Sequence, residues 1–227
     1  MKVLFTSGGT EEPIDGVRRI SNTSTGRTGA VLASYFAEKG ANVTLIRSER
    51  AQAPEKNNSD TPPVSELTYI SYSNLSDLLH SELAREHWDA VVHLAAVSDY
   101  TVDKVSVDGK PFPPGGPGKI GTGKDVILHL KPTAKILDSL REWSCNPTIK
   151  VVGFKLTDNA DKNEAEVQVR AQFDRGIVDF VVHNELRSIN AERHPASFWS
   201  HEGLLKETYT KNDMAGELFV LLEGELK

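Results

Sequence analysis

The sequence has one cysteine, Cys145, so no disulfide can form within the chain. This excludes a disulfide-stapled scaffold and agrees with a reducing compartment, and we expect a cytoplasmic protein. No activating histidine lies near Cys145, and we interpret it as structural or incidental. No apolar run approaches the roughly 20 residues of a membrane helix, and the N-terminus turns polar too early for a secretory signal.

Positive charge and metal-binding patterns are also scarce. The net charge of −6 excludes a general nucleic-acid or anionic-membrane surface. The seven histidines show no metal-ligand spacing, and no Ser-His-Asp arrangement stands out. His93 and His183 lie in apolar runs, so we interpret them as structural. We therefore predict no metal centre built by the protein.

Strand-like and helix-like segments alternate along the whole chain. An apolar run at 3–6, a helical pattern ending at Gly40 and a second strand at 41–46 predict parallel strands with a right-handed crossover. Further segments predict strands at 67–70, 90–96, 126–130, 149–154 and 177–182, helices at 75–87, 133–143, 161–175 and 212–226, and a hairpin at 197–209. No change of composition along the chain marks a domain boundary. We predict one doubly wound, Rossmann-like α/β domain over residues 1–227, with a mostly parallel sheet and the ligand site at the carboxyl ends of its strands.

Three segments predict irregular structure. Residues 11–25 form an unusual loop, and residues 51–63 are polar and proline-rich and predict a surface loop. Residues 101–125, rich in Gly, Pro and Lys, predict a mobile segment. The helix after it is predicted to be capped by Thr133.

Glycines and hydroxyls gather after the first predicted strand, in SGGT at 7–10 and SNTSTGRTG at 21–29. Each serine or threonine alone is more simply a cap or turn former. The whole run beside a glycine pair predicts a phosphate site at the start of the next helix. The segment AAVSDY at 95–100 follows a buried strand and places Asp99 at its tip, as a ligand contact or a turn residue.

The segment GKIGTGK at 118–124 formally fits the start of a Walker A motif. However, Asp125 replaces the hydroxyl residue that would hold magnesium, and the segment does not join a strand to a helix. We reject a P-loop and keep the interpretation that a flexible loop brings a lysine to phosphates.

Two alternatives to a nucleotide-dependent ligase follow from the residues. Arg47, Ser48 and Arg50 are candidate 2′-phosphate contacts of an NADP-dependent reductase, although the G-x-G-x-x-G fingerprint is missing. The other alternative is a non-catalytic nucleotide-binding module.

The run SGGTEEPIDGVRRISNTSTGRTG resembles the N-terminal signature of the phosphopantothenoylcysteine synthetases, which are phosphopantothenate–cysteine ligases. HLAAVSDY, Lys119-Ile120, the VGFK segment at 152–155 and the VHN segment at 182–184 are similar to later motifs of that family. The resemblance covers nearly the whole chain in order. The chain departs from it in a compressed loop between Tyr100 and Lys119, in PTAK at 132–135 where Thr-Pro-Lys is more usual, and in Glu185 after Asn184.

The resemblance implies ligation of 4′-phosphopantothenate to cysteine through an acyl-nucleotidylate, a step of coenzyme A biosynthesis. It implies CTP or ATP with Mg²⁺, a homodimer built partly by a hairpin within residues 101–130, and no flavin, because no decarboxylase domain precedes the first strand. It assigns catalysis to Asn22 and Lys119. It places the nucleotide on Gly8, Gly9, Ser24, Thr25, Gly26, Asp99, Phe154 and Lys155, and the other substrates on Arg18, Ser21, Ala95, Ala96 and Asn184.

Overall fold

The computed structural model describes residues 1–55, 62–190 and 192–226. The surface loop predicted over 51–63 lies partly outside these residues, and among them no helix is both long and apolar enough to cross a membrane. In chain order the elements are β1 (Lys2–Ser7), β2 (Glu11–Pro13), β3 (Arg19–Ser21), α1 (Arg27–Glu38), β4 (Asn42–Ser48), β5 (Ser65–Tyr69), α2 (Tyr72–Arg85), β6 (Ala90–His93), β7 (Tyr100–Val107), β8 (Lys110–Phe112), β9 (Val126–Pro132), α3 (Ile136–Trp143), β10 (Lys150–Thr157), α4 (Lys162–Phe173), β11 (Phe180–Glu185), a 3₁₀ turn η1 (Leu186–Ser188), β12 (Ala196–Ser200), β13 (Gly203–Thr208) and α5 (Lys211–Glu225).

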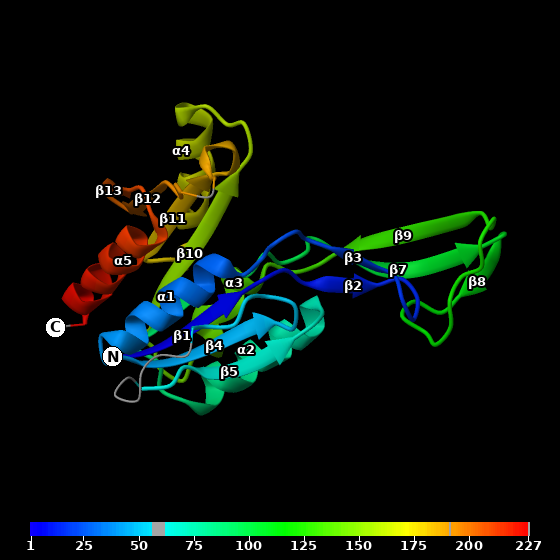
Figure 1. Ribbon diagram of the computed structural model, residues 1–227, viewed down its shortest axis with the longest axis horizontal. Coiled ribbons are helices and arrows are strands. Elements are labelled where there is room, and N and C mark those ends of the chain that lie inside the picture. The colour runs from blue at the N-terminus through cyan, green and yellow to red at the C-terminus, as the bar shows by residue number, and fades with distance from the viewer. Residues whose placement is uncertain (56–61, 191, 227) are drawn as a thin grey trace.

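The main sheet has the order β13-β12-β11-β10-β6-β1-β4-β5 within the described residues (Figure 1). Every pairing from β11 to β5 is parallel, whereas β12 and β13 pair antiparallel. The parallel strands therefore follow the doubly wound order 3-2-1-4-5-6, whose direction of winding reverses between β1 and β6. The predicted fold class is confirmed.

Helices cover both faces of this sheet. Neighbouring residues of a strand point to opposite faces, so Phe5 packs with α1 and α5, whereas Leu4 packs with α2, α3 and α4. Both side chains are fully buried. The two apolar layers fix the strand ends against each other, and these ends carry the site.

A slender projection leaves the sheet, formed by residues 11–21 and 100–132, and we call it the arm (Figure 1). It contains the β2–β3 hairpin and the sheet β8-β7-β9, around a small core of Val102, Val105 and Ile120. The prediction of a mobile segment over 101–125 is therefore wrong where β7 and β8 form. A register shift between Val102 and Lys104 interrupts the strict alternation that marks a strand in the sequence.

Two local predictions are corrected. The loop predicted over 11–25 contains the β2–β3 hairpin, whose strands have three residues each. Helix α3 starts after Lys135 without a side-chain cap, so Thr133 is not its cap. The Thr133 hydroxyl instead donates to the carbonyl oxygen of Ser98 at 2.7 Å, which ties the end of β9 to the loop after β6.

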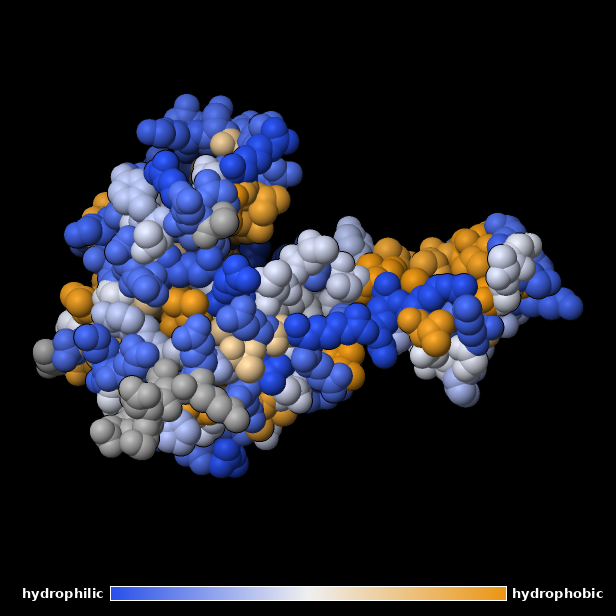
Figure 2. Space-filling model, in the orientation of Figure 1, coloured by the Kyte–Doolittle hydropathy of each residue, from blue (hydrophilic) through white to orange (hydrophobic). Residues whose placement is uncertain are grey.

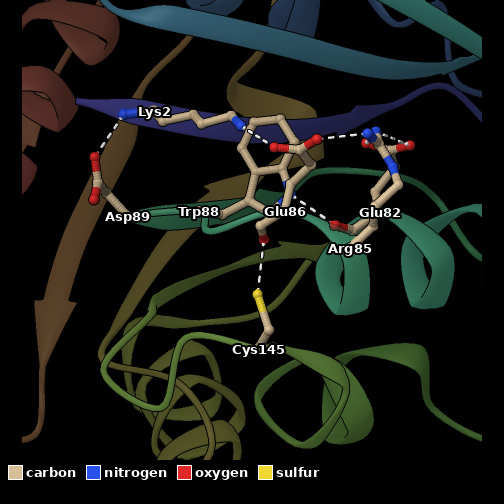
Figure 3. A network of polar contacts seen from close by, with 7 residues as sticks. All are labelled: Lys2, Glu82, Arg85, Glu86, Trp88, Asp89 and Cys145. Atoms are coloured by element: carbon tan, nitrogen blue, oxygen red, sulfur yellow. Dashed lines mark hydrogen bonds and ion pairs between the residues drawn. The ribbon is translucent and has the colours of Figure 1, made fainter.

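A polar network closes the opposite end of the parallel strands (Figure 3). The backbone N–H of Lys2 donates to the carboxylate of Asp89 at 2.7 Å. The side-chain ammonium of Lys2 pairs with Glu86 at 2.7 Å and lies 4.7 Å from the ring centre of Trp88. Cys145 donates its thiol to the carbonyl oxygen of Glu86 at 3.2 Å, a contact that agrees with a structural role. These contacts join the start of β1 to the segment before β6, away from the site.

The two outer strands of the main sheet carry irregularities or charge. A register shift interrupts the pairing of β12 with β13 between Phe198 and Trp199, and Lys206 of β13 pairs with Glu217 of α5 at 3.9 Å. On the other edge, Glu66 of β5 pairs with Arg47 of β4.

Candidate functional site

A pocket of about 780 Å³ opens at the carboxyl ends of the parallel strands, where the winding reverses between β1 and β6. Ligands of doubly wound proteins bind in this position. The pocket is lined by Ser7, Gly8, Thr23, Ser24, Thr25, Gly26, Arg27, Thr28, Gly29, His93, Leu94, Ala95, Ala96, Val97, Ser98, Asp99, Ala134, Lys135, Ile136, Leu137, Phe154, Lys155, Leu156, Gln168, Ala171, Gln172, Arg175, Asn184, Leu186, Ile189 and His194.

The first wall is the start of α1 with the hydroxyl run that precedes it. Helices α2, α4 and α5 each begin with a capping box, but α1 begins at Gly26 with no side-chain cap. The N–H of Arg27 donates to the Thr25 hydroxyl at 3.4 Å, and the first turn of α1 contains no acidic residue. A helix start of this kind favours an anion, and Ser24 and Thr25 add hydroxyls beside it.

The second wall is the loop after β6. The N–H of Ala96 donates to the carbonyl oxygen of Gly8 at 2.8 Å, so this loop and the glycine turn are joined by their backbones. Asp99 follows at the rim and pairs with the ammonium of Lys135 at the start of α3. Ala95, Ala96 and Asp99 all line the pocket as predicted.

The third wall comes from β10, β11 and α4. Phe154 and Lys155 of β10 and Asn184 of β11 line it, as predicted. The amide of Asn184 donates to the carbonyl oxygen of Pro195 at 2.6 Å, which commits that group to holding the chain after β11. From α4, Gln172 contributes a buried Oε1 that has no hydrogen-bond partner among the described residues.

The charge of the pocket is opposite in sign to that of the chain. Four cationic side chains line it, Arg27, Lys135, Lys155 and Arg175, against the carboxylate of Asp99. Lys135 pairs with Asp99 and Arg175 with Asp138 outside the lining, so Arg27 and Lys155 carry the local excess. The whole chain carries a net charge of −6. Such a local excess of positive charge, beside an uncapped helix start, suits a ligand with several phosphate charges.

Asn22 and Gly9 lie directly behind the lining. The amide of Asn22 donates to the carbonyl oxygen of Val97 at 3.1 Å, and Val97 lines the pocket. Gly9 pairs with Ala96 as a parallel bridge. A Cβ at Gly9 would lie 2.2 Å from the carbonyl oxygen of Asn22, so only glycine allows the two backbones to approach.

We expect Gly9→Ala to destabilise the protein by about 1–3 kcal/mol, because the added methyl must push the Asn22 backbone away. Urea unfolding of the purified variant measures this. The matched control is Gly224→Ala in α5, where a Cβ meets no atom within 4 Å and a helical alanine is up to about 1 kcal/mol more favourable than glycine. Equal stability of Gly9→Ala and wild type would show that the two backbones can separate freely.

Five predicted site residues are not among those that line the pocket: Asn22 and Gly9, which lie behind the lining, and Arg18, Ser21 and Lys119. Ser21 ends β3 and its hydroxyl donates to the carbonyl oxygen of Asn22 at 3.3 Å. Arg18 and Lys119 belong to the arm, where Arg18 pairs with Asp15 at 2.8 Å. The interpretation of a flexible lysine loop also needs correction, because backbone contacts hold the residues on both sides of Lys119, as described below.

The sequence analysis missed several lining residues. Arg27 and Thr28 fall inside the glycine–hydroxyl run, so their proximity to the predicted phosphate site was a usable signal. Lys135, Gln172 and Arg175 come from α3 or the end of α4, and no local pattern distinguishes them from ordinary surface residues.

The groups invoked for an NADP-dependent reductase are engaged elsewhere. Arg47 pairs with Glu66 and donates to the carbonyl oxygen of Ala51 at 3.1 Å, while Arg50 pairs with Glu11 at 3.3 Å. Neither arginine is among the residues that line the pocket. This arrangement disfavours a 2′-phosphate site at the end of β4.

Residues 1–224 match a family described as the DNA/pantothenate metabolism flavoprotein C-terminal domain. The chain belongs to this family. The coenzyme A biosynthesis bifunctional protein CoaBC of Thermococcus kodakarensis is 32% identical over 227 residues, covering 99% of this chain and 51% of that protein. The CoaBC protein of Methanocaldococcus jannaschii is 30% identical over 190 residues, covering 82% of this chain and 40% of that protein. The chain thus spans about half the length of the curated relatives it matches.

Two solved structures share the fold. A crystal structure of the DNA/pantothenate metabolism flavoprotein from Streptococcus pneumoniae matches with a TM-score of 0.86 and 29% identity, covering 99% of both chains. A Cab2 mutant in complex with phosphopantothenate-cysteine has a TM-score of 0.71 at 21% identity, covering 98% of this chain and 86% of that one. The second likeness bears on the fold alone.

Proposed function

We propose that this chain is a phosphopantothenate–cysteine ligase of coenzyme A biosynthesis, acting in the cytoplasm. The observation that carries the proposal is the cationic pocket beside the uncapped start of α1, lined by most of the residues that the sequence signature assigns. Membership of the family and the similarity to CoaBC proteins support it. The shared fold with a protein whose complex holds phosphopantothenate-cysteine agrees with it.

The proposed reaction has two steps. The carboxylate of 4′-phosphopantothenate attacks the α-phosphorus of the nucleotide, forming an acyl-nucleotidylate and releasing pyrophosphate. The amine of cysteine then attacks the acyl carbon, forms the amide, loses a proton and releases the nucleoside monophosphate. The protein contributes orientation and charge stabilisation. In our proposal the start of α1 and Lys155 hold phosphates, Phe154 borders the nucleotide, and Asn22 orients the intermediate beside the Val97 carbonyl.

CTP is the proposed nucleotide, with ATP as the alternative, and Mg²⁺ accompanies the triphosphate. Among the described residues no cluster of three or more His, Cys, Asp or Glu side chains is arranged for a metal. A magnesium ion bound mainly by phosphates needs only one or two protein carboxylates. Asp99 is the carboxylate among the described residues that line the pocket, and it would supply one oxygen ligand to the ion, whose positive charge would offset that of the phosphates.

We also propose that the active form is a homodimer that associates through the arm. Figure 2 shows hydrophobic residues along the arm, and Tyr100, Ile127 and Leu130 on it are 53%, 49% and 45% exposed. Clustered exposed apolar side chains are typical of association sites. Because Lys119 is not among the residues that line the pocket of its own chain, a second copy is the proposed recipient of its ammonium.

The test is a ligation assay with 4′-phosphopantothenate, cysteine, Mg²⁺ and either CTP or ATP. We expect 4′-phosphopantothenoylcysteine and pyrophosphate in equal amounts, and a larger rise in melting temperature with CTP and Mg²⁺ than with NADP. A larger rise with NADP and no product would favour the reductase. Nucleotide binding without any product would favour the non-catalytic module.

We expect Asn22→Asp to separate the two steps. The activation step needs no cysteine, so labelled pyrophosphate should exchange into the triphosphate without it. The substitution replaces the NH₂ that contacts Val97 by an oxygen and adds negative charge. Some exchange should remain while amide formation falls much further, so that the acyl-nucleotidylate accumulates and can be trapped for mass spectrometry. Equal loss of both rates would instead assign Asn22 to nucleotide binding or activation.

A further inference from the structure

Asp15 is a buried carboxylate in the turn between β2 and β3, and its side chain has no exposed surface. Its Oδ1 accepts hydrogen bonds from the backbone N–H groups of Val17 at 2.9 Å and Arg18 at 2.7 Å. These two contacts close the turn. A buried carboxylate needs partners on both oxygens, and the partners of the second oxygen lie elsewhere in the chain.

The second oxygen, Oδ2, accepts from the backbone N–H of Ile120, 105 positions later, at 3.1 Å. It also accepts from the guanidinium Nη1 of Arg18. The same Nη1 donates to the carbonyl oxygen of Ile120 at 3.1 Å. Gly16 donates its N–H to the carbonyl oxygen of Gly118 at 2.9 Å. A Cβ at Gly16 would lie 2.8 Å from that oxygen, so this approach requires glycine. The turn therefore holds the backbone on both sides of Lys119.

A few other contacts also hold this segment: the N–H of Gly115 donates to the carbonyl oxygen of Ile14 at 3.2 Å, and Asp108 holds Lys124 and Asp125 at the far end. Residues 113–125 form no helix or strand. Ile120 is 4% exposed and packs with Val102 and Val105, while Lys119 is exposed. The turn thus fixes the backbone from which the Lys119 side chain extends.

We propose that Asp15 is a positioning residue, which holds Ile120 and Arg18 and thereby aims the ammonium of Lys119 at the phosphates of the nucleotide. The inference rests on the proposed ligase function and on the role of Lys119 in it. Burial raises the pKa of Asp15, but backbone N–H groups of Val17, Ile120 and Arg18, with the Arg18 charge, outweigh it and lower the pKa to about 2. The group is therefore a carboxylate at any pH used for assay.

The test variant is Asp15→Asn, because an amide has one acceptor oxygen and one donor NH₂. If the oxygen keeps the turn closed, the NH₂ faces the N–H of Ile120, and two donors cannot bond. We expect cysteine-independent pyrophosphate exchange to fall about tenfold from misplacement of Lys119. Because Asp15 acts through Lys119, adding Asp15→Asn to Lys119→Ala should cause no further loss.

The matched control is Asp108→Asn, which frees a different lysine segment of the arm. Asp108 accepts from Lys124 at 2.6 Å and from the N–H of Asp125 at 3.0 Å. This variant should keep wild-type pyrophosphate exchange. In analytical ultracentrifugation each variant should have the same oligomeric state as the wild type.

Amide hydrogen exchange gives a readout that does not depend on ligation. Peptides that contain Ile120 should exchange faster in Asp15→Asn than in wild type or Asp108→Asn. Unchanged protection of Ile120 in Asp15→Asn would overturn the positioning role. So would a double variant in which the fold losses of exchange rate from Asp15→Asn and Lys119→Ala multiply. Full activity of Asp15→Asn would overturn that role alone, whereas an inactive wild type would overturn the proposed function together with it.

Discussion

Lys119→Ala is expected to lower pyrophosphate exchange about a hundredfold, since losing one charged contact to a transition state costs on the order of 3 kcal/mol. The fold should survive, because Lys119 is exposed and the arm core uses its neighbour Ile120. The matched control is Lys124→Ala, which removes a lysine paired with Asp108 at the other end of the same segment. Loss of exchange in Lys124→Ala, with normal exchange in Lys119→Ala, would show that Lys124 and not Lys119 has this role.

A mixed-dimer experiment tests whether Lys119 serves the pocket of a second copy. Lys119→Ala and Asn22→Asp chains are unfolded together, refolded in equal amounts and assayed for amide formation. If Lys119 acts across the dimer, one of the two sites in each hybrid has both residues intact, and activity returns to about a quarter of wild type. If Lys119 acts within its own chain, no hybrid site is complete and the mixture stays inactive.

Acidification is expected to destabilise the protein already below pH 6.5, before most carboxylates begin to bind protons. His93 forms part of the pocket wall, contacts the hydroxyl of Thr6 at 2.9 Å, and has a pKa lowered from 6.5 to about 4 by burial. Between these values the unfolded chain binds the proton and the folded chain does not. Stability is therefore complete above pH 6.5 and falls as the pH is lowered toward 4, by about 3 kcal/mol for this residue.

Urea unfolding between pH 7 and pH 4.5 measures the effect. His93→Gln should flatten the dependence of the unfolding free energy on pH, whatever it does to stability at pH 7. His80→Gln, which changes an exposed histidine of α2, should leave the slope unchanged. His194, whose pKa is also lowered to about 4 by burial, and His183, whose pKa is lowered by burial, act in the same direction. Identical slopes for His93→Gln and wild type would assign the acid sensitivity to these two.

The main sheet was predictable because its strands are continuous apolar runs and its helices have clear ends. Gly40, for example, follows α1 with φ of 83° and stops the helix as the sequence predicts. The arm was not predictable by the same reasoning. Strands of three residues give no periodic signal. The register shift after Val102 places Val102 and Val105 in one core, although residues on one face of a regular strand are separated by even numbers of positions.

The candidate site divides in the same way. Gly8 directly after β1, Asp99 in the loop after β6 and Phe154 in the second half of β10 could be placed because the carboxyl ends of parallel strands meet at one edge. Lys135 directly precedes α3 and Arg175 follows the end of α4, and their contribution to the pocket depends on helix packing that local sequence does not encode. The contact between Asp15 and Ile120 joins two loops 105 positions apart, which no spacing rule anticipates.

The outer strands of the main sheet bear on how copies of this chain can aggregate. An exposed, regular edge strand is a template for adding strands from other molecules without limit. Here β13 carries a bulge against β12 and a charged Lys206, and β5 carries Glu66 paired to Arg47. Such features oppose cross-molecule strand addition at either edge of the main sheet, and they disfavour open-ended fibres built by that route.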